Sequence, residues 1–127
     1  TEGISMTDQE KLYALSDAFW NAMKNSDGET MYAIADPNCN FVHIGTNANL
    51  DKEVKYYTDG IFQPTDITVH NRELHTFNDT AIVLTDVDYG LLLDGSPTTH
   101  HFMVTEVYQN QSADWKLIQF TFTALVH

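Results

Sequence analysis

The hydrophobic period of this chain changes for the rest of its length near Asp66. Before that point, apart from one short alternating stretch within Asp36 to Gly45, apolar residues recur every three or four positions, as they do along amphipathic helices. After it they recur every second position, as in strands with one buried face, and turn residues break the pattern at intervals that fit long hairpins. Helices followed by an antiparallel meander predict an α+β fold in which the sheet curls around the N-terminal helices.

The first helix is predicted from Thr7-Asp8-Gln9-Glu10, which has the spacing of a capping box. In this motif the threonine side chain and the glutamate three residues later satisfy exposed amide groups at the helix start. An amphipathic stripe then follows at three-to-four spacing: Leu12, Leu15, Phe19, Ala22 and Met23. We expect the helix to end near Asn25-Ser26-Asp27-Gly28.

Two shorter helices are expected before the period changes. Ser26 and Glu29 repeat the capping spacing, so a second helix is predicted to run up to Asp36-Pro37. Proline disfavours helix at the residue before it and ends that element. A third helix is expected from Asp51 to Thr58, with Gly60 as its stop.

A short strand is expected within Asp36 to Gly45, and it contains a histidine. Because side chains alternate along a strand, Phe41 and His43 point one way while Val42 and Ile44 point the other. If the Phe41 face is the core face, His43 is delivered into the protein interior. An imidazole is the side chain most easily tuned to exchange protons near neutral pH, so His43 is the first candidate for acid–base chemistry.

Four long strands are expected after the period changes. They are Ile67 to Phe77, Ala81 to Leu93, Thr98 to Tyr108 and Trp115 to Val126. Strands of this length are long for a flat sheet, so we expect strong twist and β-bulges. The apolar face of the second strand, which we take as the inner one, carries Val83, Thr85, Val87, Tyr89 and Leu91. Asp86 and Asp88 then face outward, as a solvated or intersubunit pair.

The length and charge of the chain limit what it can be. With 127 residues, 43% of them hydrophobic, it is long enough for one core and too short for two typical domains. We expect a single domain over residues 7–126, with residues 1–6 as a disordered lead. Acidic residues outnumber basic ones by 18 to 6, and a strongly negative surface repels phosphate backbones and anionic headgroups. Nucleic-acid and membrane partners are therefore not expected.

Cys39 is the one cysteine, so no internal disulfide is possible. It lacks an adjacent base or basic residue that would lower its pKa, so nucleophilic chemistry is not expected. No apolar run approaches the ~20 residues needed to span a bilayer, and no signal-type apolar segment opens the chain. These features predict a cytoplasmic protein.

Three segments carry a resemblance to a known group of proteins. They are Ala18-Phe19-Trp20 in the first helix, the Ala35-Asp36-Pro37 turn into Phe41-Val42-His43-Ile44-Gly45, and Trp115-Lys116-Leu117-Ile118 in the last strand. In this order, over Thr7 to Val126, the chain resembles the NTF2-like superfamily, and more narrowly the SnoaL-like and DUF4440 groups of small bacterial proteins. The resemblance implies a cystatin-like cone: a curved antiparallel sheet wrapped around the first helix, with a pocket inside and a homodimer formed through the sheet.

The resemblance also implies where a proton-transfer site would lie. In isomerase-like members a carboxylate on the first strand moves a proton, while a helix phenol and an acid from a later strand hold the oxyanion. His43 falls at or next to the proton-shuttling position. The other two positions fall on Phe19 or Trp20 and near Val104, and of these only Trp20 can donate a hydrogen bond. Each lost oxyanion donor costs roughly 3 kcal/mol of transition-state stabilisation, so steroid isomerase activity is not expected.

Other side chains are expected to line the pocket. His100 and His101 are adjacent in a strand, so one must face inward, and we favour His101, beside Met103, Thr105 and Val107. Tyr56 and Tyr57 lie on the third helix, which in this architecture is at the pocket mouth. The expected ligand-binding set is Trp20, Phe41, Tyr57, Tyr89 and His101, with core packing or a satisfied hydrogen bond as the alternative role for each.

Six histidines raise the question of a metal site. His70 and His75, together with His100-His101, match no strong ligand spacing, and the chain has no H-x-H or C-x-x-C pair. No metal and no other cofactor is expected.

Three functions follow from these features. The leading hypothesis is a protein that binds a small apolar or aromatic molecule in the cone. The second is an isomerase-, dehydratase- or cyclase-type enzyme with His43 as general acid/base. The third is a noncatalytic dimerisation or association module. The superfamily that the chain resembles includes isomerases, dehydratases, epoxide hydrolases and polyketide cyclases alongside such modules.

Overall fold

The computed structural model describes residues 7–43, 46–93, 95–112 and 114–125. Several parts of the expected elements lie outside these ranges: the lead at residues 1–6, Ile44, Gly45, Asp94, Ala113 and Val126.

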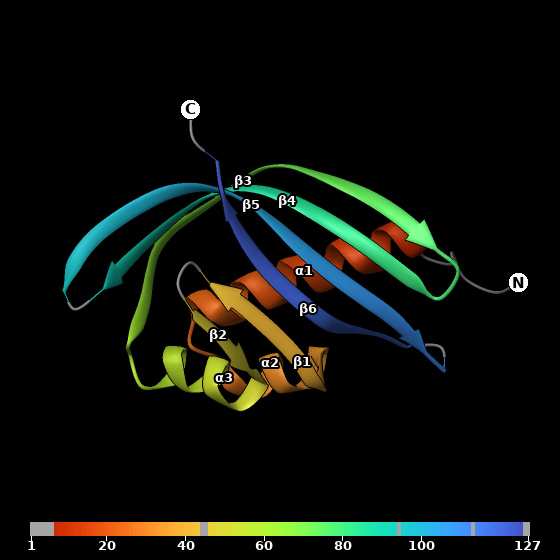
Figure 1. Ribbon diagram of the computed structural model, residues 1–127, viewed down its shortest axis with the longest axis horizontal. Helices are drawn as coiled ribbons and strands as arrows, with labels where there is room; N and C mark the ends of the chain where they lie inside the picture. The colour runs from red at the N-terminus through yellow and green to blue at the C-terminus, as the bar shows by residue number, and fades with distance from the viewer. Residues whose placement is uncertain (1–6, 44–45, 94, 113, 126–127) are drawn as a thin grey trace, which may run out of the picture.

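Three helices lie in the first half of the chain (Figure 1): α1 (Asp8–Lys24), α2 (Gly28–Ile34) and α3 (Leu50–Thr58). The capping box of α1 is confirmed. Thr7 Oγ1 accepts from the Glu10 N–H at 3.1 Å, and Glu10 Oε1 accepts from the Thr7 N–H at 2.9 Å. The third helix is confirmed to within one residue. No helix in the described part of the chain is long and apolar enough to cross a membrane.

The start of α2 differs from the expectation. Asp27, rather than Ser26, caps this helix, because the Asp27 carboxylate accepts from the Thr30 N–H at 3.2 Å. Ser26 instead adopts a left-handed φ of 56° in the turn that follows α1. The predicted end at Asp36-Pro37 is also wrong: Ala35 is already extended, because it pairs with β6 and enters the sheet.

Six strands form one sheet, in the order β2-β1-β6-β5-β4-β3. Their bounds are β1 Ala35–His43, β2 Thr46–Asn49, β3 Phe62–Phe77, β4 Thr80–Leu93, β5 Ser96–Gln111 and β6 Asp114–Ala124. Consecutive strands from β3 to β6 pair antiparallel, so the predicted meander is confirmed. β1 pairs parallel with β6 and antiparallel with β2, a short strand that the sequence pattern did not predict.

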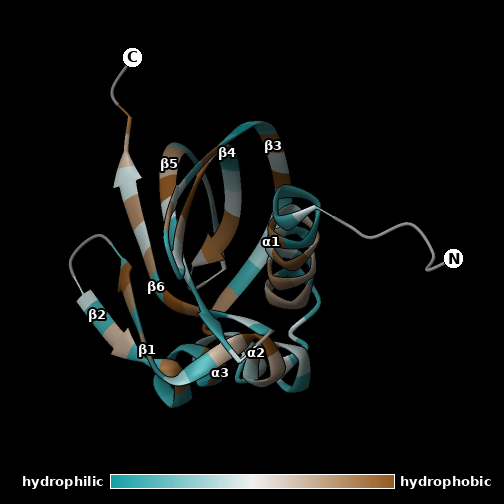
Figure 2. Ribbon diagram, turned by 90° about the vertical axis from the view of Figure 1, so that its right-hand side faces the viewer, coloured by the Kyte–Doolittle hydropathy of each residue, from teal (hydrophilic) through white to brown (hydrophobic). Residues whose placement is uncertain are grey.

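The long strands are twisted and bent, as expected (Figure 1). On β3, register shifts interrupt the ladder between Pro64 and Ile67 and between Val69 and Asn71. Such β-bulges bend a strand and increase its twist. Strands β3 to β5 curve beside α1, while α2 and α3 lie together at the base of the molecule (Figure 2). This arrangement of helices within a curved antiparallel sheet confirms the α+β cone.

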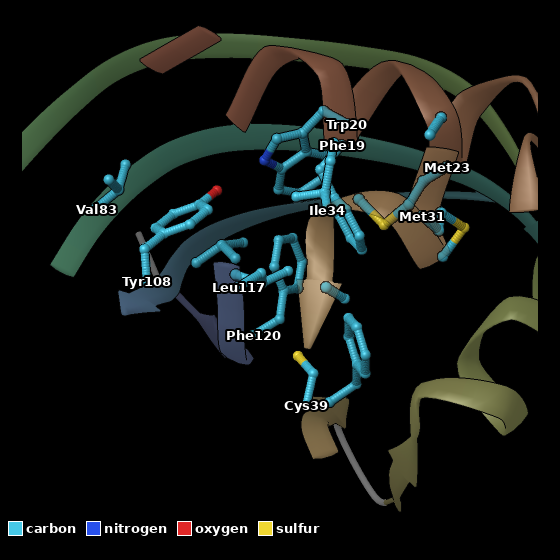
Figure 3. Close-up of a cluster of buried hydrophobic side chains, with 14 of the residues drawn as sticks. Phe19, Trp20, Met23, Met31, Ile34, Cys39, Val83, Tyr108, Leu117 and Phe120 are labelled. Carbon is cyan, nitrogen blue, oxygen red and sulfur yellow. The ribbon is translucent and has the colours of Figure 1, made fainter. Parts of the chain in front are cut away.

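One hydrophobic core joins the helices to the sheet (Figure 3). Its members include Phe19, Trp20 and Met23 of α1, Met31 and Ile34 of α2, and Phe41, Val83, Tyr108, Leu117 and Phe120 of the strands. Phe41 is fully buried, so its face of β1 is the core face. His43, two residues further along β1, therefore lies on the same side of the strand.

Candidate functional site

A cavity of about 330 Å³ lies beside His43, and we call it the cone pocket. Its apolar wall is formed by Phe62, Leu91, Phe102 and Phe122, and its polar groups are His43, Tyr89, Thr98 and His100. These residues come from β1 and from all four strands of the meander. The pocket therefore forms only because the curvature of the sheet brings these five strands around one space.

A larger surface groove, of about 550 Å³, lies between α1, α2 and the start of β6. Lys11, Leu15 and Trp115 contribute to its walls. Lys116, in the same wall, donates from Nζ to the Ala33 carbonyl at 2.8 Å. None of the predicted site residues lines this groove, so the cone pocket is the candidate site.

His43 is held in the pocket wall by aromatic packing. Its ring stacks on Phe122 with 4.8 Å between centroids and meets Phe62 edge-on at 5.2 Å. The side chain is 12% exposed. The predicted inward orientation of His43 is therefore confirmed.

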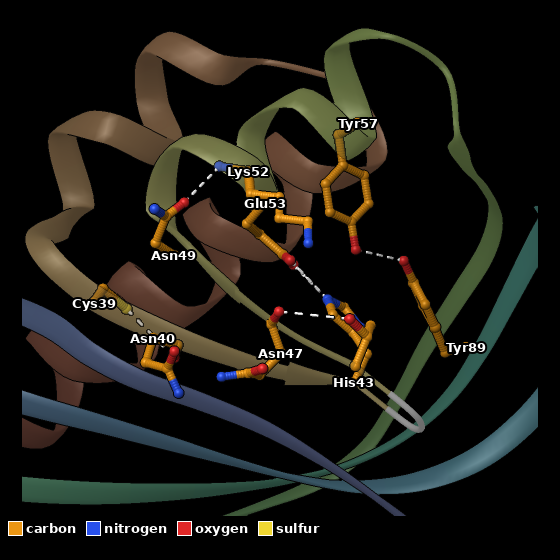
Figure 4. Close-up of polar contacts among 10 residues, drawn as sticks. Cys39, Asn40, His43, Asn47, Asn49, Lys52, Glu53, Tyr57 and Tyr89 are labelled. Carbon is orange, nitrogen blue, oxygen red and sulfur yellow. Dashed lines mark hydrogen bonds and ion pairs between the residues drawn. The ribbon is translucent and has the colours of Figure 1, made fainter.

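A buried glutamate fixes the chemistry of His43 (Figure 4). His43 Nε2 lies 2.7 Å from Glu53 Oε1 and 2.8 Å from Oε2, and the Glu53 side chain is fully buried. When the Glu53 carboxylate is ionised it can only accept, and Nε2 then carries the hydrogen while Nδ1 of the neutral ring is an acceptor. Among the described residues Nδ1 has no hydrogen-bond partner. This is the arrangement in which a carboxylate orients a histidine for acid–base work.

Local sequence places Glu53 on the inner side of α3. The Asn49 side chain caps the helix by accepting from the Lys52 N–H at 2.9 Å. From there Leu50, Val54 and Tyr57 form the buried stripe, and Glu53 lies within it. Sequence analysis missed Glu53 because a charged residue is usually assigned to the solvent face. Glu53 lies three residues after Leu50 and four before Tyr57, and this spacing, which places it on the apolar face of the helix, could have indicated its burial.

Tyr57 and Tyr89 bring a second polar pair to the pocket. Their hydroxyl oxygens lie 2.8 Å apart (Figure 4). Tyr89 lines the cavity, whereas Tyr57 does not. Burial raises the pKa of both phenols, so both stay protonated at neutral pH. When Tyr57 donates to Tyr89, the Tyr89 hydroxyl keeps its own hydrogen to donate into the pocket.

Trp20 and Phe41 lie in the core and do not line the cavity. Trp20 Nε1 donates to Glu106 Oε2 at 2.9 Å, and the Trp20 ring meets Tyr89 edge-on at 5.8 Å. Phe41 stacks on Phe19 at 5.9 Å. Both side chains support the pocket from behind rather than forming its surface.

Glu106 is a second buried carboxylate that the sequence analysis missed. Besides the Trp20 indole, it accepts from Thr85 Oγ1 at 2.6 Å and from the Tyr108 hydroxyl at 2.7 Å. Glu106 lies on the same face of β5 as Val104, two residues away, where the resemblance had placed an acid position. With three donors already bound, this carboxylate stabilises the core, and it does not line the cone pocket.

The expected inward orientation of His101 is wrong. The inner face of β5 carries Phe102, Val104 and Glu106, so His100 lines the pocket instead. His101 bonds through Nε2 to Asp86 on the outer face of the sheet. The sequence prediction failed because it followed the apolar residues of the other face and did not anticipate that Glu106 is buried.

Two further expectations concern reactive groups. Cys39 is buried, and burial raises the pKa of its thiol to about 12, which opposes thiolate chemistry. In the described part of the chain, no group of three or more His, Cys, Asp or Glu side chains is arranged to hold a metal ion.

Comparison with known proteins places the chain in a structural context. A family model described as a SnoaL-like domain matches residues 12–126. An NTF2-like protein from Cytophaga hutchinsonii has a similar structure, with a TM-score of 0.86 and 16% identity over 94% of this chain and 100% of that one. The sequence matches no curated protein.

Two other solved structures are similar. The CaMKII hub of S. rosetta has a TM-score of 0.79 and 21% identity, over 96% of this chain and 100% of the hub. A protein with a cystatin-like fold from Caulobacter vibrioides has a TM-score of 0.78 and 17% identity, over 93% of this chain and 89% of that one. At these identities the three structures establish the fold alone.

Proposed function

The chain belongs to the SnoaL-like domain family of the NTF2-like superfamily, and we propose that it binds a small apolar or aromatic molecule in the cone pocket. The observation that carries this proposal is the position of His43, held by Glu53, in the wall of a cavity lined mainly by aromatic rings. An apolar cavity with a few convergent polar groups is the usual form of a small-molecule site.

The size and lining of the pocket support a ligand with an apolar body and one polar group. Its volume of about 330 Å³ is at the small end of the range of roughly 300–1,000 Å³ that is typical of such sites. Phe62, Phe102 and Phe122 offer ring faces and edges to an aromatic body. His43 and Tyr89 offer a polar contact to a carbonyl or hydroxyl oxygen.

A thermal-shift screen with acetophenone, 2-naphthol and related aromatic carbonyls and phenols tests the proposal. Bound ligand should raise the melting temperature. Leu91→Trp, which fills the pocket, should abolish the shift. Phe77→Trp is the matched control, because Phe77 is 59% exposed at the other end of β3. The proposal would be contradicted if no compound raised the melting temperature of wild type, or if the compounds raised that of Leu91→Trp by as much.

Proton transfer is a second candidate function, favoured by the orientation of His43. With Nε2–H held by Glu53, Nδ1 is the nitrogen that can take a proton from a substrate. The Tyr89 hydroxyl, backed by Tyr57, supplies an oxyanion donor in the same cavity. This donor comes from β4 rather than from the positions of Phe19 and Val104.

Deuterium incorporation from D₂O into the α-position of a bound ketone measures this activity directly. Wild type should accelerate exchange, and His43→Ala should abolish the acceleration. Tyr89→Phe should reduce the exchange rate more than it weakens binding, because the hydrogen bond from Tyr89 strengthens as charge develops on the ligand oxygen. An unchanged exchange rate in His43→Ala would rule out the acid–base role while leaving ligand binding intact.

Self-association through the outer face of the sheet is the partner interaction that the fold favours. No helix of the described residues covers this face (Figure 2), and it carries the half-buried apolar side chains Ile82, Leu84, Met103 and Val107. One of the similar structures is a CaMKII hub. Sedimentation should give a dimer or larger assembly at micromolar concentration, and Leu84→Lys should dissociate it. Ile61→Lys should not, because Ile61 is 46% exposed and lies between α3 and β3, outside the sheet. A wild-type monomer would contradict this interaction.

A further inference from the structure

Three histidine–carboxylate pairs lie on the outer face of the sheet, and we call them the outer pairs. They are His101 with Asp86, His70 with Asp88 at 2.9 Å, and His75 with Glu73 at 3.5 Å. The exposed fraction of these six side chains runs from 28% to 54%. The rings of His70 and His101 also meet edge-on, with 6.0 Å between centroids. Two of the pairs therefore form one cluster across β3, β4 and β5.

Alternation along the strands places the outer pairs on this face. Thr85 of β4 is buried against the core, so Leu84 and Asp86 on either side of it point outward. On β3, Glu73 is the cross-strand partner of Leu84 and shares its face. The helices cover the opposite face of the sheet, so the outer pairs are open to a second copy of the chain (Figure 2).

The strand register brings one outer pair into the apolar surface that we propose for self-association. Asp86 lies directly opposite Met103 between β4 and β5, and it is two residues from Leu84. His101, which bonds to Asp86, is two residues from Met103 on the same face. A copy that covers Leu84 and Met103 therefore also covers the His101–Asp86 pair.

Histidine supplies the positive charge on this face. In the described parts of β3 to β6 the other basic residues are Arg72 and Lys116, and both are bonded to helices. Arg72 pairs with Asp17 of α1, and Lys116 donates to the Ala33 carbonyl of α2. The outer carboxylates thus have imidazoles, and no lysine or arginine of these strands, to neutralise them.

Other neighbours of the outer pairs add no positive charge. On β6, the positions opposite Met103 and Thr105 are Thr123 and Thr121, which carry no charge. The remaining carboxylates of the four strands are Glu106 in the core, Asp114 in the groove beside α2, and Asp66 in a bulge of β3. The charge of this face near neutral pH therefore depends on its histidines.

Each outer pair carries one negative charge while its imidazole is neutral and none once the imidazole is protonated. The charge of an imidazole ordinarily changes between pH 5 and 8, a range in which carboxylates are ordinarily ionised. Acidification through this range can therefore remove three negative charges from the outer face of each copy.

Association makes this change of charge costly to ignore. Two copies that meet through the same face bring like charges together, and unneutralised carboxylates would be both repelled and desolvated. In the monomer the pairs are exposed to solvent, which screens them and makes each pair weak. A proton taken up by either member of a pair removes its net charge, so association and proton uptake favour each other.

We propose that two copies of the chain associate through the outer face more tightly as the pH falls from 8 to 6, because the outer pairs take up protons in the interface. This inference rests on the self-association proposed above and adds its regulation.

Sedimentation of the full chain over a concentration series, at pH 6 and at pH 8 and at one ionic strength, tests the inference. The Kd of the wild-type dimer should be at least about tenfold lower at pH 6. Linkage sets this scale, because uptake of one proton per dimer changes the Kd by up to about tenfold per pH unit.

Variants assign the effect to the outer pairs. His101→Gln can still donate to Asp86 but takes up no proton, so it should weaken association at pH 6 and reduce the pH dependence. Adding His70→Gln should remove most of what remains. Asp86→Asn removes a carboxylate and should instead tighten association at pH 8, a gain that the mere loss of a structural contact would not give. His100→Gln is the matched control, since His100 lines the cone pocket, and it should keep the wild-type pH dependence.

The possible failures are distinguishable. A dimer with the same Kd at both pH values, or with a lower Kd at pH 8, would overturn the inference and leave self-association standing. Wild-type pH dependence in the double variant His70→Gln/His101→Gln would do the same. A monomer at both pH values would overturn the self-association itself, and the inference with it.

Discussion

Both carboxylate oxygens of Glu53 face one nitrogen of His43, with Oε1 at 2.7 Å and Oε2 at 2.8 Å from Nε2. The Glu53 side chain has no exposed surface, so this bond compensates the burial of a charge. Glu53→Gln should lower the free energy of unfolding by about 2 kcal/mol, because a charge-assisted hydrogen bond is replaced by a neutral one. Urea denaturation at pH 7 measures the change.

Glu73→Gln is the matched control for this prediction. Glu73 also faces a histidine, His75, but at 3.5 Å and with both side chains about half exposed, so its loss should change stability little. The same pairing predicts that neutral His43 in wild type is the Nε2–H tautomer, which ¹⁵N NMR reports. An Nδ1–H tautomer would contradict the orientation proposed for acid–base chemistry.

Glu106 accepts hydrogen bonds from Trp20, Thr85 and Tyr108 inside the core. Glu106→Leu would leave three buried donors unpaired, and it should destabilise the fold by on the order of 3 kcal/mol or more. Thr85→Val removes one of these donors. In a double-mutant cycle, Thr85→Val should therefore cost less in the Glu106→Leu background than in wild type. Additive effects would mean that the Thr85–Glu106 contact contributes nothing.

The helices and the meander could be predicted because short-range patterns determine them. The two buried glutamates could not, because their burial depends on partners far away in the sequence: Glu53 on His43, and Glu106 on Trp20. The wrong face chosen for His101 has the same origin, since the buried Glu106 sets the alternation of β5. Local periodicity shows where an apolar face lies, but it does not show which carboxylate has a partner inside the core.

The cap of α2 gives a prediction that depends on pH. The hydrogen bond from the Thr30 side chain, together with that from its backbone N–H, lowers the pKa of Asp27 below its ordinary value. A lowered pKa in the folded state means that ionised Asp27 stabilises the fold above its unfolded pKa, and that this contribution is lost as pH falls through the folded value. Asp27→Ala should therefore lower the melting temperature at pH 7, and the difference from wild type should disappear in acid.

Ser26→Gly is the control for the cap. Glycine tolerates the left-handed φ of 56° at this position, so the substitution removes the Ser26 side chain without straining the backbone. It should not lower the melting temperature. A decrease in melting temperature as large as that caused by Asp27→Ala would indicate that Ser26, rather than Asp27, caps the helix.

Cys39 should be unreactive in the native protein. Burial raises the pKa of its thiol to about 12, so the thiolate is scarce at pH 8 and the sulfur is shielded from reagents. Labelling with iodoacetamide at pH 8 should be slow for the folded chain and fast for the urea-unfolded chain, since modification then requires opening of the core. Similar rates in the two states would contradict the burial of this residue.

Gly90 on β4 lies against the bulged part of β3. A Cβ added to Gly90 would lie 2.6 Å from Thr65 Oγ1 and 3.0 Å from the Asp66 carbonyl oxygen. Because part of this contact is with backbone, Gly90→Ala should destabilise the fold by about 1–3 kcal/mol, as overpacking does elsewhere. Thr65→Ala removes the closer contact and leaves the backbone contact, so it should rescue Gly90→Ala only in part. Urea denaturation of the single and double variants measures both effects, and wild-type stability in Gly90→Ala would mean that the two strands do not approach this closely.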